Sequence, residues 1–171
     1  MEFIRITEVE TFFLIGMNFF GDPFEKASAW SEENQIGELW KRFYKYYSTN
    51  SGLIKNVRFQ DCTFEIHFIT QQTIETGLFD VFAGVIVSRL EDIPIECVAR
   101  QLPPTRYAVF TLKGEEITSD WGGEILNTWL GKEYEVSYNF SVLCYDKRFK
   151  GIDSVESSEM DVYIPVREKN I

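Results

Sequence analysis

The chain has 171 residues, of which 44% are hydrophobic and 26% are charged, and its formal net charge is −10. This length and apolar content suit one globular domain, or two small fused modules, with a real core. The acidic balance and the lack of a long lysine and arginine run argue against direct nucleic-acid binding, because phosphate contacts need local positive charge. No segment approaches the roughly 20 apolar residues that cross a bilayer, so we expect no membrane partner.

The N-terminus and the cysteines indicate the compartment. Residues 11–16 are apolar but follow several glutamates, where an export signal would carry positive charge. Cys62, Cys97 and Cys144 are odd in number and widely spaced, which favours neither a disulfide framework nor a zinc site. We therefore predict a cytoplasmic protein with no metal and no cofactor.

The first half begins with a strand-like run at residues 9–20. Ser31 is a candidate N-cap for a helix that ends at residues 50–52, where glycine follows asparagine and serine. An apolar stripe at helical spacing lies between them and consists of Ile36, Leu39, Trp40, Phe43 and Tyr47. The pattern predicts one helix packed through this stripe.

Two further strands are predicted at residues 63–70 and 79–88. The first alternates, which puts Glu65 and His67 on one face and the phenylalanines and isoleucine between them on the other. Alternation alone does not say which face is wet. Glu65 and His67 therefore face either a groove or solvent.

The second half repeats this order. A strand is predicted at 107–112, and Ser119 or Asp120 is a candidate cap for a helix that Gly131 ends. The face of that helix consists of Trp121, Ile125 and Trp129. Gly122 and Gly123 weaken it by about 1 kcal/mol each relative to alanine, which indicates close packing or simply a poor helix. Strands follow at 140–145 and 160–166, with a polar loop at 153–158.

The order strand–helix–strand–strand thus occurs twice. We predict an α+β fold with a largely antiparallel sheet and two modules related by a pseudo-twofold axis, at about 1–90 and 95–171. A groove for a ligand is expected where the modules meet, because pockets prefer such junctions.

Several short motifs carry a resemblance to a known family. They are Gly21-Asp-Pro-Phe24, Ile36-Gly-Glu-Leu-Trp40, Phe82-Ala-Gly-Val85, Ile93-Pro94, Tyr107-Ala-Val-Phe110, Trp129-Leu130, Tyr145-Asp-Lys-Arg-Phe149 and Tyr163-Ile-Pro165. In this order they resemble the GyrI-like domain, an effector-binding module of bacterial transcription regulators, and the integron-associated effector-binding proteins. The resemblance covers residues 1–171 as a single domain. Relatives occur fused behind AraC-type or MerR-type DNA-binding helices, whereas this chain resembles the stand-alone form.

The resemblance implies a small organic ligand, often cationic and aromatic, held between the modules by aromatic side chains. The residues that it places around the groove are Trp40, Tyr44, Phe82, Tyr107, Trp129, Tyr145 and Tyr163. Core packing is the alternative for each, most strongly for Phe82 and Trp40. The tyrosines other than Tyr44 are better groove candidates, because a buried phenol needs a hydrogen-bond partner and a wet groove supplies one.

The family commonly carries an acidic residue two positions before the tyrosine of the Tyr145 motif, and Leu143 stands there in this chain. The resemblance therefore supplies no charge at that position. Glu65, with His67 beside it, is the candidate substitute because it lies on the corresponding strand of the first module.

Three functions follow from these features. The first is a small-molecule-binding protein for drug-like effectors, connected with transcription regulation or xenobiotic response and with multidrug binding. The second is a hydrolase of reactive electrophiles, with Glu65 as candidate base and Tyr107 or Tyr145 as the positioning hydroxyl. The third is a protein-binding inhibitor of the DNA gyrase type, for which the acidic charge suits a basic partner. The expected partners are a small organic ligand and, in the first or third case, a regulator or gyrase.

Overall fold

The computed structural model describes residues 1–27, 30–131 and 133–169 and shows an α+β fold built on one antiparallel sheet. Its strands are β1 (Glu2–Val9), β2 (Phe12–Gly21), β3 (Thr63–Phe68), β4 (Phe79–Val87), β5 (Val98–Leu102), β6 (Thr105–Lys113), β7 (Tyr134–Val136), β8 (Phe140–Tyr145) and β9 (Glu159–Glu168). Its α-helices are α1 (Gln35–Asn50), α2 (Gln71–Thr76) and α3 (Trp121–Glu124), and a wider π-helical turn, η3 (Ile125–Trp129), continues α3. Three short 3₁₀ segments are η1 (Ser51–Leu53), η2 (Gly114–Thr118) and η4 (Ile152–Ser157).

The strand order has a twofold pattern. Along the sheet the strands run β1-β6-β9-β8-β3-β4-β2-β5, and β7 adds to β9. The order β6-β9-β8 on one side mirrors β2-β4-β3 on the other, and β8 pairs with β3 at the centre. This confirms the predicted α+β class with antiparallel pairing.

Each half of the chain also contributes one edge strand to the other half of the sheet. β1 precedes β2 in the chain but pairs with β6, and β5 precedes β6 but pairs with β2. Neither strand was predicted from the sequence, and neither were β7 and α2. β1 and β5 lie at the sheet edges and carry several exposed or half-buried polar residues, so neither shows a clear apolar pattern.

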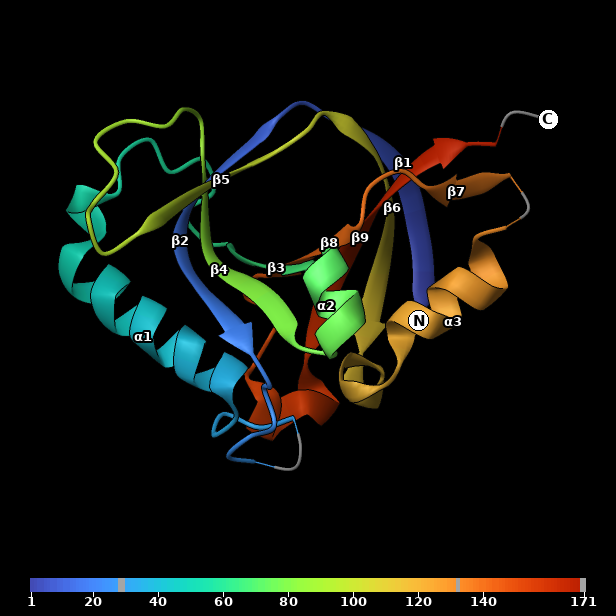
Figure 1. Ribbon diagram of the computed structural model, residues 1–171, viewed down its shortest axis with the longest axis horizontal. Coiled ribbons are helices and arrows are strands. Elements are labelled where there is room, and N and C mark those ends of the chain that lie inside the picture. The colour runs from blue at the N-terminus through green and yellow to red at the C-terminus, as the bar shows by residue number, and fades with distance from the viewer. Residues whose placement is uncertain (28–29, 132, 170–171) are drawn as a thin grey trace.

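Three apolar clusters hold the sheet and the helices together. One fills the inner side of the curved sheet and includes Leu14, Ile66 and Phe82. The second packs α1 against β2 and β4, and the third packs α3 and η3 against β6 and β9. Figure 1 shows α1 and α3 on opposite flanks of the molecule, with β3 and β8 between them. This arrangement leaves the outer face of the central strand pair uncovered by a long helix.

The helix α1 begins later than predicted. The amide of Gly37 donates to Oδ1 of Asn34 at 2.8 Å, so Asn34, and not Ser31, caps the helix. Ser31 instead accepts a 3.3 Å bond from the amide of Glu33 in the preceding loop. The predicted stripe is confirmed at Ile36, Leu39 and Phe43, the helix residues that are buried.

The helix predicted in the second half of the chain is α3, which is short, and its two glycines differ in the space around them. Asp120 caps it by accepting from the amide of Gly123 at 3.1 Å, as one of the two predicted alternatives requires. A Cβ on Gly123 would lie 2.4 Å from the Asp120 carboxylate, whereas a Cβ on Gly122 would meet nothing within 4 Å. Close packing therefore explains Gly123 but not Gly122. No helix in the described part of the chain is long and apolar enough to cross a membrane.

Candidate functional site: an aromatic cavity with a buried carboxylate

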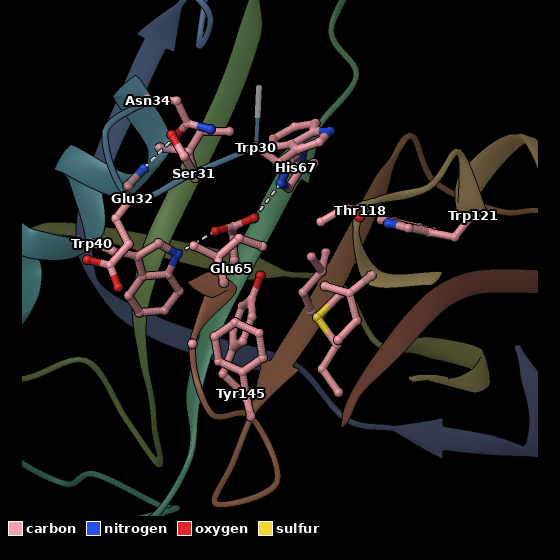
Figure 2. Close-up of a pocket in the computed structure, with 18 of the residues that line it drawn as sticks. Trp30, Ser31, Glu32, Asn34, Trp40, Glu65, His67, Thr118, Trp121 and Tyr145 are labelled. Atoms are coloured by element: carbon pink, nitrogen blue, oxygen red, sulfur yellow. Dashed lines mark hydrogen bonds and ion pairs between the residues drawn. The ribbon is translucent and has the colours of Figure 1, made fainter. Parts of the chain in front are cut away.

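A cavity of about 760 Å³ opens between α1 and the segment that runs from η2 into α3. Strands β3 and β8 form its floor through Glu65, His67, Leu143 and Tyr145. Trp40 of α1 and Trp121 of α3 approach from opposite sides, as Figure 2 shows. Both halves of the sheet thus contribute to one cavity, in the groove that the sequence predicted between them.

Glu65 is the buried acidic side chain of this floor. Only 4% of the surface of Glu65 is exposed. The indole Nε1 of Trp40 donates to Oε2 of Glu65 at 2.5 Å, and Nε2 of His67 lies 2.6 Å from Oε1 (Figure 2). Hydrogen bonds to an ionised group are stronger than neutral ones, so these two partners hold the carboxylate in place.

The strand β3 puts Glu65 and His67 on the cavity side because its alternate residues Phe64 and Ile66 fill the inner core. Of the two orientations that the sequence left open, the structure has the one in which this pair faces the groove. His67 is more exposed than Glu65, with 20% of its side chain accessible against 5%. The imidazole is therefore more accessible from the cavity than the carboxylate that it contacts.

Aromatic rings surround the carboxylate. The ring of Trp40 stacks on Tyr44 with centroids 5.2 Å apart, and Tyr145 meets Trp40 edge-on at 5.3 Å. The Tyr145 ring also meets Phe149 edge-on at 4.7 Å. Edge-to-face and offset contacts of this kind fix ring orientation. The cavity wall on the α1 side is consequently a rigid aromatic corner.

The phenols in this corner stay protonated. Burial raises the pKa of Tyr145 well above its usual range, and the nearby charge of Glu65 adds to the effect. Burial also raises the pKa of Tyr44, against an opposing hydrogen bond in which either Tyr44 Oη or Thr63 Oγ1 is the donor, at 3.0 Å. Neither tyrosine competes with Glu65 as a negative charge at neutral pH.

Leu143 lies directly opposite Glu65. The two residues are register partners in the β3–β8 pair, and Leu143 is buried against the α3 cluster while it lines the cavity. The position that the family resemblance marks for an acid is thus apolar in this chain. A carboxylate is present at the same level of the floor, on the neighbouring strand.

Four residues suggested by the resemblance lie elsewhere. Phe82, Tyr107 and Tyr163 belong to the inner core on the opposite side of the sheet, and Trp129, the last residue of η3, stacks against Phe3 at 4.7 Å. Strand alternation is the reason for the first three. Tyr107 is fully buried, and its hydroxyl has no hydrogen-bond partner among the described residues, so a wet groove does not satisfy it.

Several cavity residues were not among the predicted ones. Trp30 from the loop before α1 packs edge-on to Phe79 at 6.3 Å, and both line the cavity with Trp121 and Ile117. The sequence did mark Trp121, because it lies on the apolar face of the helix predicted in the second half of the chain. Trp30 had no such signal, since it stands in a polar loop whose path depends on the rest of the fold.

The described residues of the cavity offer no arrangement for a metal. Within the residues that the structure describes, no group of three histidine, cysteine or acidic side chains could hold a metal ion. What the site offers is one buried carboxylate in an aromatic enclosure on an antiparallel α+β scaffold. These are features of a binding module for organic molecules.

Comparison with known proteins assigns the family. The family model of the integron-associated effector binding proteins matches residues 5–166, which is nearly the whole chain. The chain belongs to this family and has its effector-binding, GyrI-like fold.

Individual relatives agree with this assignment. The chain is 28% identical over 169 residues to the transcriptional regulator BrlR of Pseudomonas aeruginosa, covering 95% of this chain but only 54% of that protein. Among solved structures it is similar to SAV2435 bound to tetraphenylphosphonium, with a TM-score of 0.67 and 15% identity over 98% of this chain and 94% of that one. It is also similar to an integron cassette protein of Vibrio cholerae, with a TM-score of 0.58 and 18% identity over 95% of each chain.

Proposed function

We propose that this protein binds a small, cationic, aromatic or hydrophobic organic molecule in the cavity over β3 and β8, and that Glu65 supplies the charge that recognises it. The observation that carries the proposal is the buried Glu65 carboxylate on the floor of an aromatic cavity. Residues 1–171 act in this proposal as one effector-binding domain, since both halves contribute to the floor.

Two physical effects favour a cation. The faces of Trp40 and Tyr44 carry the negative end of the ring quadrupole, which attracts positive charge. A carboxylate in a poorly hydrated site adds a Coulomb attraction that bulk water would weaken. A large cation whose charge is shielded by aromatic groups is weakly hydrated, so moving it into the cavity costs less than moving a small ion.

The hydrogen bonds of Glu65 orient its carboxylate. Trp40 donates to one carboxylate oxygen and His67 lies against the other. Each carboxylate oxygen has two lone pairs, so both oxygens keep acceptor capacity. Glu65 is therefore held in place while it still attracts positive charge.

The relatives support this reading by analogy. The solved structure of SAV2435 contains tetraphenylphosphonium, a cation that itself carries four phenyl groups. BrlR is named as a transcriptional regulator, and the chain spans about half its length. We infer that the ligand-bound state of this domain serves transcription regulation or a response to foreign compounds.

Tryptophan fluorescence tests the binding directly. Trp30, Trp40 and Trp121 line the cavity, and only Trp129 of the four tryptophans lies elsewhere. Tetraphenylphosphonium is expected to change the emission saturably, and neutral triphenylphosphine oxide is expected to bind much more weakly. Equal or absent responses to both compounds at high micromolar concentration would contradict the proposal.

A hydrolase of reactive electrophiles is the second candidate. Glu65 and Tyr145 share the cavity, which is the pairing of acid and phenol that such chemistry needs, whereas Tyr107 lies on the other side of the sheet. Turnover of an aromatic epoxide or hydrazone by the wild type, abolished in Glu65→Gln, would establish it. A rate unchanged by Glu65→Gln would remove Glu65 from that role.

A further inference from the structure

A second cavity of about 490 Å³ adjoins the first. It lies between the end of β3, helix α2 and the outer side of α3, and its exposed apolar side chains include Ile69, Ile74 and Leu126. Four residues, His67, Phe79, Trp121 and Gly122, line both cavities. These four residues form the boundary that the two cavities share.

We propose that this second cavity is a subsite for an apolar arm of the ligand, so that the preferred ligand is an amphiphilic cation with an aromatic head over Glu65 and a hydrocarbon extension toward α2. The inference rests on the proposed function, because it takes the head group to bind in the first cavity. It adds a second recognition element and a shape to the ligand.

The position of His67 places the two recognition elements close together. Its Nε2 lies 2.6 Å from the Glu65 carboxylate, and the same residue forms part of the second cavity. One side chain therefore separates the charged floor of the first cavity from the second. A chain of a few methylenes on the head group spans that separation.

The lining of the second cavity is mostly apolar, which suits a hydrocarbon. Ile74 of α2 is 63% exposed and Leu126 of η3 is 52% exposed, and both line this cavity. Among the described residues that line it, Asp80 is the carboxylate, and His67 and Tyr138 are the other titratable groups. Covering exposed leucine and isoleucine with hydrocarbon is favourable in proportion to the area removed from water.

Gly122 explains how the arm passes. Its helical position has no steric need for glycine, because an added Cβ would meet nothing within 4 Å. Glycine costs a helix about 1 kcal/mol relative to alanine, so the missing side chain weakens α3 without a packing gain. The space that it leaves open lies at the boundary of the two cavities, where a side chain would stand in the path of the arm.

The test is a series of alkyltriphenylphosphonium ions from methyl to hexyl, measured by titration calorimetry. We expect the affinity of the wild type to rise about two- to fourfold with each added methylene. Ile74→Ser and Leu126→Ser, both at exposed positions, are expected to flatten this rise and leave methyltriphenylphosphonium unchanged. Gly122→Leu is expected to abolish the rise, whereas the matched control Gly122→Ala keeps most of it.

The outcomes separate this inference from the proposed function. If the methyl compound binds but affinity does not depend on chain length, or the rise survives in Gly122→Leu and both serine variants, the subsite is wrong and the charged first cavity stands. If no member of the series binds, the proposed function falls and the subsite with it. Circular dichroism of each variant verifies that the fold is retained.

Discussion

Glu65 on β3 and Leu143 on β8 are direct register partners at the centre of the sheet. Both lie in the floor of the cavity, on either side of the line where the two halves of the sheet meet. The strand order around them is twofold, so β3 and β8 occupy equivalent places in the two halves of the sheet. This chain therefore carries its carboxylate on the first half of the sheet.

The twofold relationship predicts that the carboxylate can be exchanged between the strands. Glu65→Leu alone is expected to lower the affinity for tetraphenylphosphonium at least tenfold. Adding Leu143→Glu to it is expected to recover most of that loss, since the new carboxylate faces the same aromatic walls. Calorimetry on the single and double variants measures this, and a double variant no better than Glu65→Leu would refute the equivalence.

Leu143→Glu in the presence of Glu65 is expected to destabilise the fold. Two carboxylates would then lie directly opposite each other in a buried ladder, where like charges repel and only one can ionise freely. We expect the free energy of unfolding to fall by about 2 kcal/mol or more. Urea denaturation at pH 7 measures it, and a variant as stable as the wild type would show that the floor is more hydrated than its burial indicates.

Trp40 is expected to matter to both stability and binding. Trp40→Phe removes the donor to Oε2 of Glu65 and should lower the free energy of unfolding by about 1.5 to 3 kcal/mol, the range for a hydrogen bond to a charged group. Affinity for the cation should fall as well. Trp129→Phe is the matched control: it loses packing against Phe3 and Phe110 but leaves the cavity intact. Equal cation affinities of the two variants would show that the Trp40 indole donor does not contribute to binding of the cation.

Gly16 and Gly84 are expected to be irreplaceable at the pairing of β2 with β4. They face each other in register, and a Cβ on Gly16 would lie 2.1 Å from the carbonyl oxygen of Ala83. Gly16→Ala should therefore cost about 3 kcal/mol in unfolding free energy. Gly122→Ala, at an open helical position, should instead gain up to about 1 kcal/mol. Thermal unfolding of the two variants decides whether backbone contact in the sheet sets this requirement.

The buried tyrosines predict how stability depends on alkaline pH. Burial raises the pKa of Tyr107 and of Tyr145, and it raises that of Tyr163 to about 12. Above the usual tyrosine pKa of about 10 the unfolded chain releases protons that the folded chain keeps, so stability falls as pH rises. The stability that these tyrosines contribute is fully present below about pH 10. Between pH 10 and its raised folded-state pKa, each such tyrosine lowers the free energy of unfolding by about 1.4 kcal/mol per pH unit.

Urea denaturation at pH 8, 9, 10 and 11 measures this slope. Tyr107→Phe is expected to reduce it and to cost little stability at pH 8, because the Tyr107 hydroxyl is buried without a hydrogen-bond partner among the described residues. Constant stability from pH 8 to 11 would contradict the protonated state assigned to these phenols.

The sequence predicted the fold better than the site. Long apolar periods such as the one in α1 and the alternation in β3 located the central elements, because packing on one face imposes a period. The edge strands β1 and β5 were missed, since an edge strand needs no continuous apolar pattern. Their exchange between the two halves depends on the whole chain and leaves no local signal.

Strand parity explains the mixed result at the site. Trp40, Tyr44, Glu65, His67, Leu143 and Tyr145 line the cavity, whereas Phe82, Tyr107 and Tyr163 lie on the inner face of the sheet. Alternation groups residues by face within one strand but does not say which face of one strand matches which face of another. Pairing decides that, and pairing is a property of the folded sheet.

The most direct test of the account is a calorimetric titration of the wild type and Glu65→Gln with tetraphenylphosphonium and with neutral triphenylphosphine oxide. The amide keeps the size of Glu65 and removes its charge. We expect at least a tenfold loss of affinity for the cation and no more than a twofold change for the neutral compound. Unchanged cation affinity, or an equal loss for both compounds, would show that the Glu65 carboxylate does not recognise the ligand.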